Sequence, residues 1–127
     1  VVHGRDGLDE ISAAAPTFVA EVADGKIGCY TIDPADYGLK GDANACRGGT
    51  PAENAAIILG VLRGQRGGGR DIVLLNAAAA LKVAGLAGDL REGLARAAAS
   101  IDGGAALGKL EALRAFSRRQ GEGSPLS

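Results

Sequence analysis

The chain predicts an α/β protein in which a strand end and a β-hairpin precede about four helices. The first observation is a change of hydrophobic period near Thr50, from β-prone runs to runs with helical spacing. The second is a composition of 46% hydrophobic and 23% charged residues, which is typical of a globular protein. The third is an aromatic share of only 3%, so that Ala, Leu, Val and Ile must build the core. A length of 127 residues fits about one domain.

The first part of the chain carries the strand signals. Val1 and Val2 are apolar and β-branched, and they predict the last part of a strand before a glycine-punctuated turn. Residues 17–22 and 27–32 flank Asp24-Gly25, a pair that accepts the positive φ angles of a tight hairpin turn. Residues 35–49 are rich in Gly, Asp and Asn and predict a long loop.

The next part begins with a helix start at Thr50, which combines an N-cap with Pro51 at the first helical position and Glu53 as the partner in a capping box. Gly64 ends this helix, and the run Gly67-Gly68-Gly69 predicts a flexible joint. Residues 71–84 are apolar on nearly every face and predict a buried helix.

Two more helices follow. Asp89 and Glu92 form a second expected capping box, and one face of the helix after it carries apolar residues at helical spacing. These residues are Leu90, Leu94, Ala97 and Ile101. After Gly103-Gly104, a last amphipathic helix carries Leu107, Leu110 and Leu113. Residues 1–118 are assigned to the domain, and residues 119–127 to a polar, disordered tail.

Charge and cysteine content exclude several functional classes. A net charge of -1, with basic residues scattered along the chain, gives no electrostatic reason to expect nucleic acid or an anionic membrane as partner. Cys29 and Cys46 are too few and too far apart for a cysteine-based zinc site, and they fit reduced cytosolic thiols. His3 is the only histidine, which excludes a histidine-based triad and favours a structural role for this residue.

One segment carries candidate metal chemistry. Asp6, Asp9 and Glu10 lie close together in a loop that leaves a strand end, where α/β proteins place ligand sites. Carboxylates are hard oxygen ligands, and Mg²⁺ takes one or two of them together with water and substrate phosphates. The alternative is that these acids are ordinary solvated surface, as adjacent acids in loops usually are. The residues alone leave both interpretations open.

The segment Val2-His3-Gly4, followed by Asp6-Gly7-Leu8-Asp9-Glu10-Ile11-Ser12, closely resembles the Asp-Glu motif of anthranilate phosphoribosyltransferases. The similarity covers residues 1–116 and is most specific in Leu-Asp-Glu-Ile-Ser. The other matching segments, in order, are Gly48-Gly49, Pro51-Ala52-Glu53-Asn54-Ala55, Asp71-Ile72-Val73-Leu74-Leu75-Asn76-Ala77-Ala78, Gly103-Gly104-Ala105-Ala106-Leu107 and Lys109-Leu110-Glu111.

The resemblance implies the C-terminal portion of the α/β catalytic domain shared by nucleoside phosphorylases and phosphoribosyltransferases, in glycosyltransferase family 3. It implies transfer of the phosphoribosyl group of 5-phosphoribosyl 1-pyrophosphate to anthranilate, which gives N-(5-phosphoribosyl)anthranilate and pyrophosphate in tryptophan biosynthesis. Mg²⁺ is the implied cofactor, with Asp9 and Glu10 as its ligands and Glu10 the better placed to bridge two ions. Asp6 is left out because that position varies in the family. The complete enzyme is expected to be cytoplasmic and homodimeric.

The chain departs from the family pattern in what it lacks. Its 127 residues contain neither the Gly-Thr-Gly-Gly-Asp phosphate loop nor the Lys-His-Gly-Asn segment of the family. We therefore expect an N-terminal portion to be missing and this chain to be inactive alone, and no catalytic or substrate-binding residue is assigned in it.

Three rival interpretations remain. A pyrimidine-nucleoside phosphorylase shares the fold but should lack Leu-Asp-Glu-Ile-Ser. A paralogue that binds nucleic acid should carry a basic stripe, which is absent. A non-enzymatic helical interaction module would use Asp9 and Glu10 only as surface.

Three polar residues have expected structural roles. Ser12 is placed to cap or hydrogen-bond the acidic segment, because no base for a catalytic serine is visible. Asn76 lies in the predicted buried helix and is interpreted as a core polar group whose hydrogen bonds are satisfied. Asn54 follows a helix start and is placed to brace the long loop.

Overall fold

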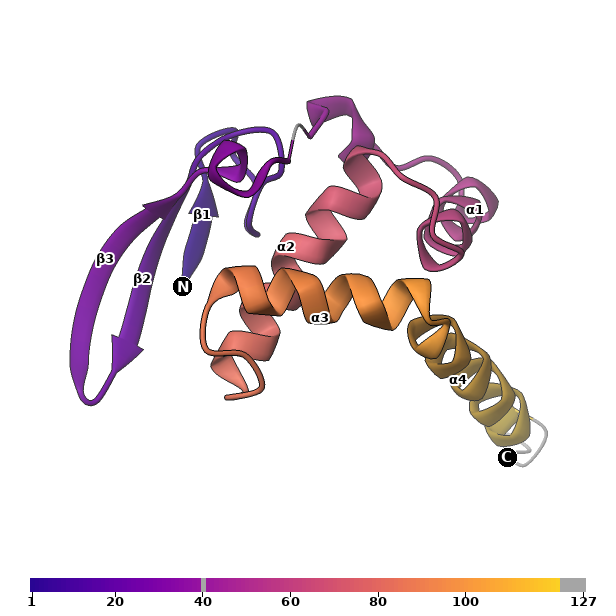
Figure 1. Ribbon diagram of the computed structural model, residues 1–127. Coiled ribbons are helices and arrows are strands. Elements are labelled where there is room, and N and C mark those ends of the chain that lie inside the picture. The colour runs from indigo at the N-terminus through magenta and orange to yellow at the C-terminus, as the bar shows by residue number, and fades with distance from the viewer. Residues whose placement is uncertain (40, 122–127) are drawn as a thin grey trace, which may run out of the picture.

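The computed structural model describes residues 1–39 and 41–121 and confirms the predicted order of strand end, hairpin and helices (Figure 1). Within the described residues, one antiparallel sheet has the strand order β1 (Val2–Gly4), β2 (Thr17–Ala23), β3 (Lys26–Ile32). The α-helices described after it are α1 (Pro51–Leu62), α2 (Gly68–Val83), α3 (Leu90–Asp102) and α4 (Ala105–Gly121). Figure 1 shows the sheet to one side of α2 and α3, and α4 extending from the end of α3.

The hairpin forms where the Asp-Gly pair predicts it. Asp24 has a φ of 50° and Gly25 a φ of 72°, the pair of positive angles that a tight turn between twisted strands requires. The register pairs Ala23 with Lys26 and Thr17 with Ile32. The predicted long loop carries two short 3-10 helices, Pro34–Tyr37 and Ala43–Cys46.

The two predicted helix starts differ in detail. At α1 the capping box is complete: Glu53 N–H donates to Thr50 Oγ1, and Thr50 N–H donates to Glu53 Oε2 at 2.7 Å. At α3, Asp89 Oδ1 accepts from Glu92 N–H at 2.8 Å, as predicted. The reciprocal bond of the predicted capping box, from Asp89 N–H to the Glu92 carboxylate, does not form, so this part of the prediction is wrong. Glu92 Oε2 accepts from Gly88 N–H at 2.8 Å instead, because the amide that Glu92 reaches in this extended segment is one residue earlier.

The predicted glycine joint is shorter than expected. Gly67 lies outside α2 with a φ of 132°, whereas Gly68 and Gly69 already belong to the first helical turn. The reason is that Gly67 C=O accepts from Arg70 N–H and Asp71 N–H at 2.9 and 3.1 Å, so the helical hydrogen bonds start there.

Helix α2 contributes to both parts of the core. One cluster joins the sheet side to α2 and α3, and the other joins α1, α2 and α3. The first contains Ile11, Ala13, Val19, Ile32, Ile72, Leu75, Ala78 and Leu90. The second contains Val61, Leu74, Ala97 and Ile101. Leu75 and Ala78 are fully buried, so the middle of α2 is the centre of the described molecule.

Burial departs from the prediction at two helices. Residues 71–84 were expected to be buried on nearly every face, but Val73 is 40% and Val83 87% exposed, because neither lies among the residues of α2 that enter the two core clusters. On α4, Leu113 is 62% exposed because this helix extends away from the core (Figure 1). The predicted tail at 119–127 begins as the last residues of α4, and 122–127 lie outside the described residues. No helix in the described ranges combines the length and hydropathy needed to cross a membrane.

Helices α2 and α3 approach closely at Gly93. A Cβ atom added to Gly93 would lie 2.7 Å from Ala78 O and 2.9 Å from Ala78 Cα. Both atoms belong to the backbone of α2, so they cannot move aside without shifting the helix. The two helices are also joined by an ion pair of 2.9 Å between the buried Arg70 and Asp102. The Arg70 guanidinium donates to Asp102 and holds the pKa of that carboxyl below its usual range.

We predict that Gly93→Ala lowers the free energy of unfolding by about 1–3 kcal/mol, because the added methyl group overpacks the contact with Ala78. The matched control is Gly108→Ala on α4, where the new methyl group meets nothing within 4 Å. There the better helix propensity of alanine should raise the free energy of unfolding by up to about 1 kcal/mol. Urea denaturation followed by circular dichroism measures both, and a stabilising Gly93→Ala would contradict the described packing.

Candidate metal-binding site

The predicted acidic segment lies in a loop, residues 4–12, that we call the acidic loop. It leaves β1 and ends against the core. Asp6, Asp9 and Glu10 are exposed, whereas Ile11 and Ser12 are each only 1% exposed. The acids therefore face solvent from a loop whose far end is anchored in the interior.

The start of the acidic loop is a tight turn that requires glycine. Gly4 N–H donates to Leu8 C=O at 2.8 Å, and Gly7 N–H donates to Gly4 C=O at 2.9 Å. A Cβ atom on Gly4 would lie 2.5 Å from Asp6 Oδ1, too close for any other residue without displacing that carboxylate. Gly7 has a φ of 95°, which side chains rarely allow.

Asp6 is committed to the internal structure of the loop. Its carboxylate accepts from the Ser12 hydroxyl at 2.6 Å, and Ser12 Oγ in turn accepts from Ala14 N–H and Ala15 N–H at 3.0 and 3.1 Å. The Ser12 hydroxyl bond lowers the pKa of Asp6 from its ordinary value, against a smaller opposing effect of burial. The prediction that Ser12 hydrogen-bonds the acidic segment is confirmed.

The carboxylates of Asp9 and Glu10 differ from that of Asp6, which bonds within the loop. Among the described residues, neither carboxylate forms a hydrogen bond or an ion pair. The described chain contains no group of three or more His, Cys, Asp or Glu side chains arranged to hold a metal ion. The two carboxylates fit Mg²⁺ nonetheless, because that ion commonly takes only one or two protein carboxylates and completes its shell with water and substrate phosphates.

The long loop adds further negative charge beside the acidic loop. Gly41 N–H donates to Ala13 C=O at 3.0 Å. A hollow of about 130 Å³ between the two loops is lined by residues that include Asp6, Ser12, Asp42 and Cys46. Burial raises the pKa of the Cys46 thiol, and the carboxylates of Glu10, Asp6 and Asp42 raise it further. This environment disfavours a thiolate and favours a cation.

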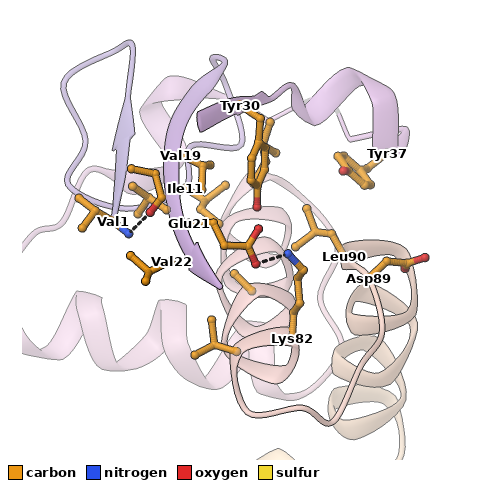
Figure 2. A pocket seen from close by; sticks show the side chains of 15 residues that line it. Val1, Ile11, Val19, Glu21, Val22, Tyr30, Tyr37, Lys82, Asp89 and Leu90 are labelled. Carbon is orange, nitrogen blue, oxygen red and sulfur yellow. Dashed lines mark hydrogen bonds and ion pairs between the residues drawn. The ribbon is translucent and has the colours of Figure 1, made fainter. Parts of the chain in front are cut away.

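The larger hollows lie elsewhere. One of about 660 Å³ opens between the hairpin and the helices α2 and α3 (Figure 2). Its wall includes Glu21 and Lys82, which pair with each other at 2.5 Å, and Lys82 lowers the pKa of Glu21 by hydrogen bonding. Its charged groups are therefore largely satisfied, and it offers a ligand mainly apolar contact. A second hollow of about 880 Å³ runs along α2, α3 and the start of α4. Neither is lined by Asp9 or Glu10.

The two asparagines have the structural roles that the sequence predicts. Asn54 braces the long loop, because its side chain accepts from Gly49 N–H at 2.8 Å and donates to Gly49 C=O at 3.2 Å. Asn76 is a satisfied polar group of α2, and its partner is the backbone of Ile11 at the end of the acidic loop. The sequence analysis did not predict that Asn76 bonds Ile11 or that Cys46 lies beside the acidic loop. Both contacts join residues far apart in the sequence, so no local sequence pattern indicates them.

Comparison with known proteins places the chain in a family. The sequence model of a protein family, described as the glycosyl transferase family, a/b domain, matches residues 1–107 of this chain. Anthranilate phosphoribosyltransferase of Anaeromyxobacter dehalogenans is 58% identical over 114 residues, which cover 89% of this chain and 34% of that protein.

Solved structures agree in fold. The crystal structure of anthranilate phosphoribosyltransferase from Thermus thermophilus matches with a TM-score of 0.82 and 38% identity, over 93% of this chain and 35% of that one. The Saccharomyces cerevisiae enzyme, solved in complex with PRPP and Mg, matches with a TM-score of 0.75 and 30% identity, over 87% of this chain and 32% of that one. The yeast enzyme has also been solved in complex with 4-fluoroanthranilate.

This chain spans about a third of the length of these relatives. The family match nevertheless extends over most of its residues, from residue 1 to the beginning of α4. The chain therefore belongs to the glycosyl transferase family, of which it forms part of the a/b domain.

Proposed function

We propose that this chain works as the C-terminal third of an anthranilate phosphoribosyltransferase. In that role it helps to transfer the phosphoribosyl group of 5-phosphoribosyl 1-pyrophosphate to anthranilate, with pyrophosphate as the other product. The observation that carries the proposal is a pair of exposed carboxylates, Asp9 and Glu10, on an anchored loop of a chain that is 58% identical to such an enzyme. The similarity to these transferases supports this activity over that of a pyrimidine-nucleoside phosphorylase.

In this proposal Asp9 and Glu10 are the residues that would hold Mg²⁺. Bound Mg²⁺ would supply neutralisation of the negative charge that grows on the departing pyrophosphate. The relative from yeast that was solved with PRPP and Mg supports the choice of ion. The carboxylates bind and orient the metal–pyrophosphate end of the substrate, and catalysis then depends on positioning rather than on a side-chain nucleophile of this chain.

Asp6 is outside the proposed ligand set for a physical reason. Its carboxylate already accepts from Ser12, so binding a cation would have to compete with the bond that shapes the loop. The cytoplasmic location and the homodimeric state of the complete enzyme stay predictions.

A chimera tests the proposed activity. We predict that the Thermus thermophilus enzyme, with its matching third replaced by this chain, consumes anthranilate only when PRPP and Mg²⁺ are present. The double variant Asp9→Asn and Glu10→Gln should lower kcat/KM about 100-fold or more, because both metal ligands lose their charge. Loss of anthranilate fluorescence measures the rate.

The matched control for the chimera removes the same two charges elsewhere. Asp24 lies at the hairpin turn and Glu111 on exposed α4, so Asp24→Asn with Glu111→Gln should leave the rate unchanged. A chimera that is equally active with and without the carboxylates of Asp9 and Glu10 would remove their proposed role. A folded chimera without activity would count against the function itself.

The role of Asp6 makes a separate prediction. Ser12→Ala should raise the pKa of the Asp6 carboxyl toward its ordinary value, because the hydroxyl that donates to the ionised form is lost. In the unmodified chain this lowered pKa stabilises the fold above the ordinary aspartate pKa, and the contribution disappears as the pH falls through the folded pKa. Carbon-13 NMR titration of the aspartate carboxyl carbons measures it. An Asp6 pKa that does not move in Ser12→Ala would show that the hydroxyl is not its main partner.

A further inference from the structure

The carboxylates of Asp9 and Glu10 are not held by partners of their own in the described chain, so their position depends on the backbone that carries them. That backbone is fixed immediately after Glu10. Asn76 Oδ1 accepts from Ile11 N–H at 3.0 Å, and Asn76 Nδ2 donates to Ile11 C=O at 2.9 Å. The N–H of Ile11 belongs to the peptide group that joins Glu10 to Ile11, so the first of these bonds holds the peptide next to Glu10.

The side chain that makes this contact is itself rigid. The second N–H of Asn76 Nδ2 donates to Ile72 C=O at 3.0 Å, one turn earlier on α2. Both donor hydrogens and the acceptor oxygen of the amide are thus engaged, and an amide rotated by half a turn would place N–H against N–H. Leu75 and Ala78, on either side along the helix, are fully buried, so α2 offers a fixed base.

An asparagine at position 76 lowers the stability of α2 unless the hydrogen bonds of its side-chain amide are made. A polar amide inside an apolar helix costs free energy unless its hydrogen bonds are made. The bond to Ile72 stays within α2. The two other bonds join Asn76 to Ile11, which lies 65 residues earlier at the end of the acidic loop. In the described residues neither backbone group of Ile11 has another hydrogen-bond partner.

We infer that Asn76 is a positioning residue, which holds the Ile11 backbone on α2 and thereby sets where Asp9 and Glu10 meet a divalent cation. The inference rests on the proposed metal role of the acidic loop. Residues that orient metal ligands without touching the ion commonly change metal affinity by about 10–100-fold when they are replaced.

The chain contains its own control. The side chain of Asn54 forms the same pair of hydrogen bonds with the backbone of Gly49, one accepted and one donated, in the long loop before α1. Replacing Asn54 removes an equivalent contact at Gly49, which is not among the residues that line the hollow beside the acidic loop. A merely structural role for Asn76 predicts that both replacements lower stability and that neither changes metal affinity while the protein stays folded.

The test uses Asn76→Leu, Asn76→Ala and Asn54→Leu in the full chain, with Mn²⁺ as the probe. Urea denaturation establishes that each variant is folded, and Asn76→Ala carries the test should Asn76→Leu not fold. The alanine removes both bonds to Ile11 without adding a charge beside the acidic loop. Amide hydrogen exchange reports the contact, and electron paramagnetic resonance of free Mn²⁺ reports the affinity.

We expect the Asn76 variants to exchange the Ile11 amide about tenfold faster or more, and to bind Mn²⁺ about tenfold more weakly. Asn54→Leu should speed exchange at Gly49 and leave the Mn²⁺ affinity unchanged. Folded Asn76 variants that bind Mn²⁺ as tightly as the unmodified chain would overturn the inference and leave the metal site standing. If Asp9→Asn with Glu10→Gln binds Mn²⁺ as tightly as the unmodified chain, the metal proposal fails and this inference fails with it, even where the Ile11 amide shows the contact.

Discussion

The burial of helix α2 is the constraint on which the rest of the molecule depends. Its middle, at Leu75 and Ala78, is fully buried, and its residues enter both core clusters. Ile72 packs with the sheet side and Leu74 with the helices. Because cores are close-packed, α2 cannot shift without disturbing both clusters. The acidic loop is bonded to this same helix through Asn76, so the buried helix also anchors the loop that carries the candidate site.

The acidic loop divides its carboxylates between structure and ligand binding. Asp6 turns inward to Ser12 and helps to shape the loop, whereas Asp9 and Glu10 remain exposed. Asp42, from the long loop, adds to the negative charge felt at Cys46. A cation near the loop would be favoured by this charge, and Asp9 and Glu10 can bind it without breaking any bond formed among the described residues.

Local rules predicted much of the fold, since the signals lie within a few residues of each other. Asp24-Gly25 sets the hairpin turn, and Thr50 with Glu53 sets the start of α1. The hydrogen bonds between Asn76 and Ile11 join residues 65 positions apart, and no periodicity or motif in the sequence predicts such a contact.

Burial was predicted less well than secondary structure. Val73 has the hydropathy of a core residue, yet it is 40% exposed, because its burial depends on which elements pack there. For the candidate site, the exposure and spacing of Asp9 and Glu10 follow from the residues. Their proposed metal role depends on family resemblance, since two adjacent acids alone do not distinguish a ligand pair from solvated surface.

The most direct test of the metal site is paramagnetic broadening by Mn²⁺, added at substoichiometric amounts to the nitrogen-15-labelled chain. If Asp9 and Glu10 form the site, the amide signals of residues 8–12 should broaden first, because paramagnetic broadening falls steeply with distance from the ion. Neighbouring signals from the long loop near Cys46 should follow. First broadening at other exposed acids, such as Asp36 or Glu111, with the acidic loop unaffected, would contradict the account.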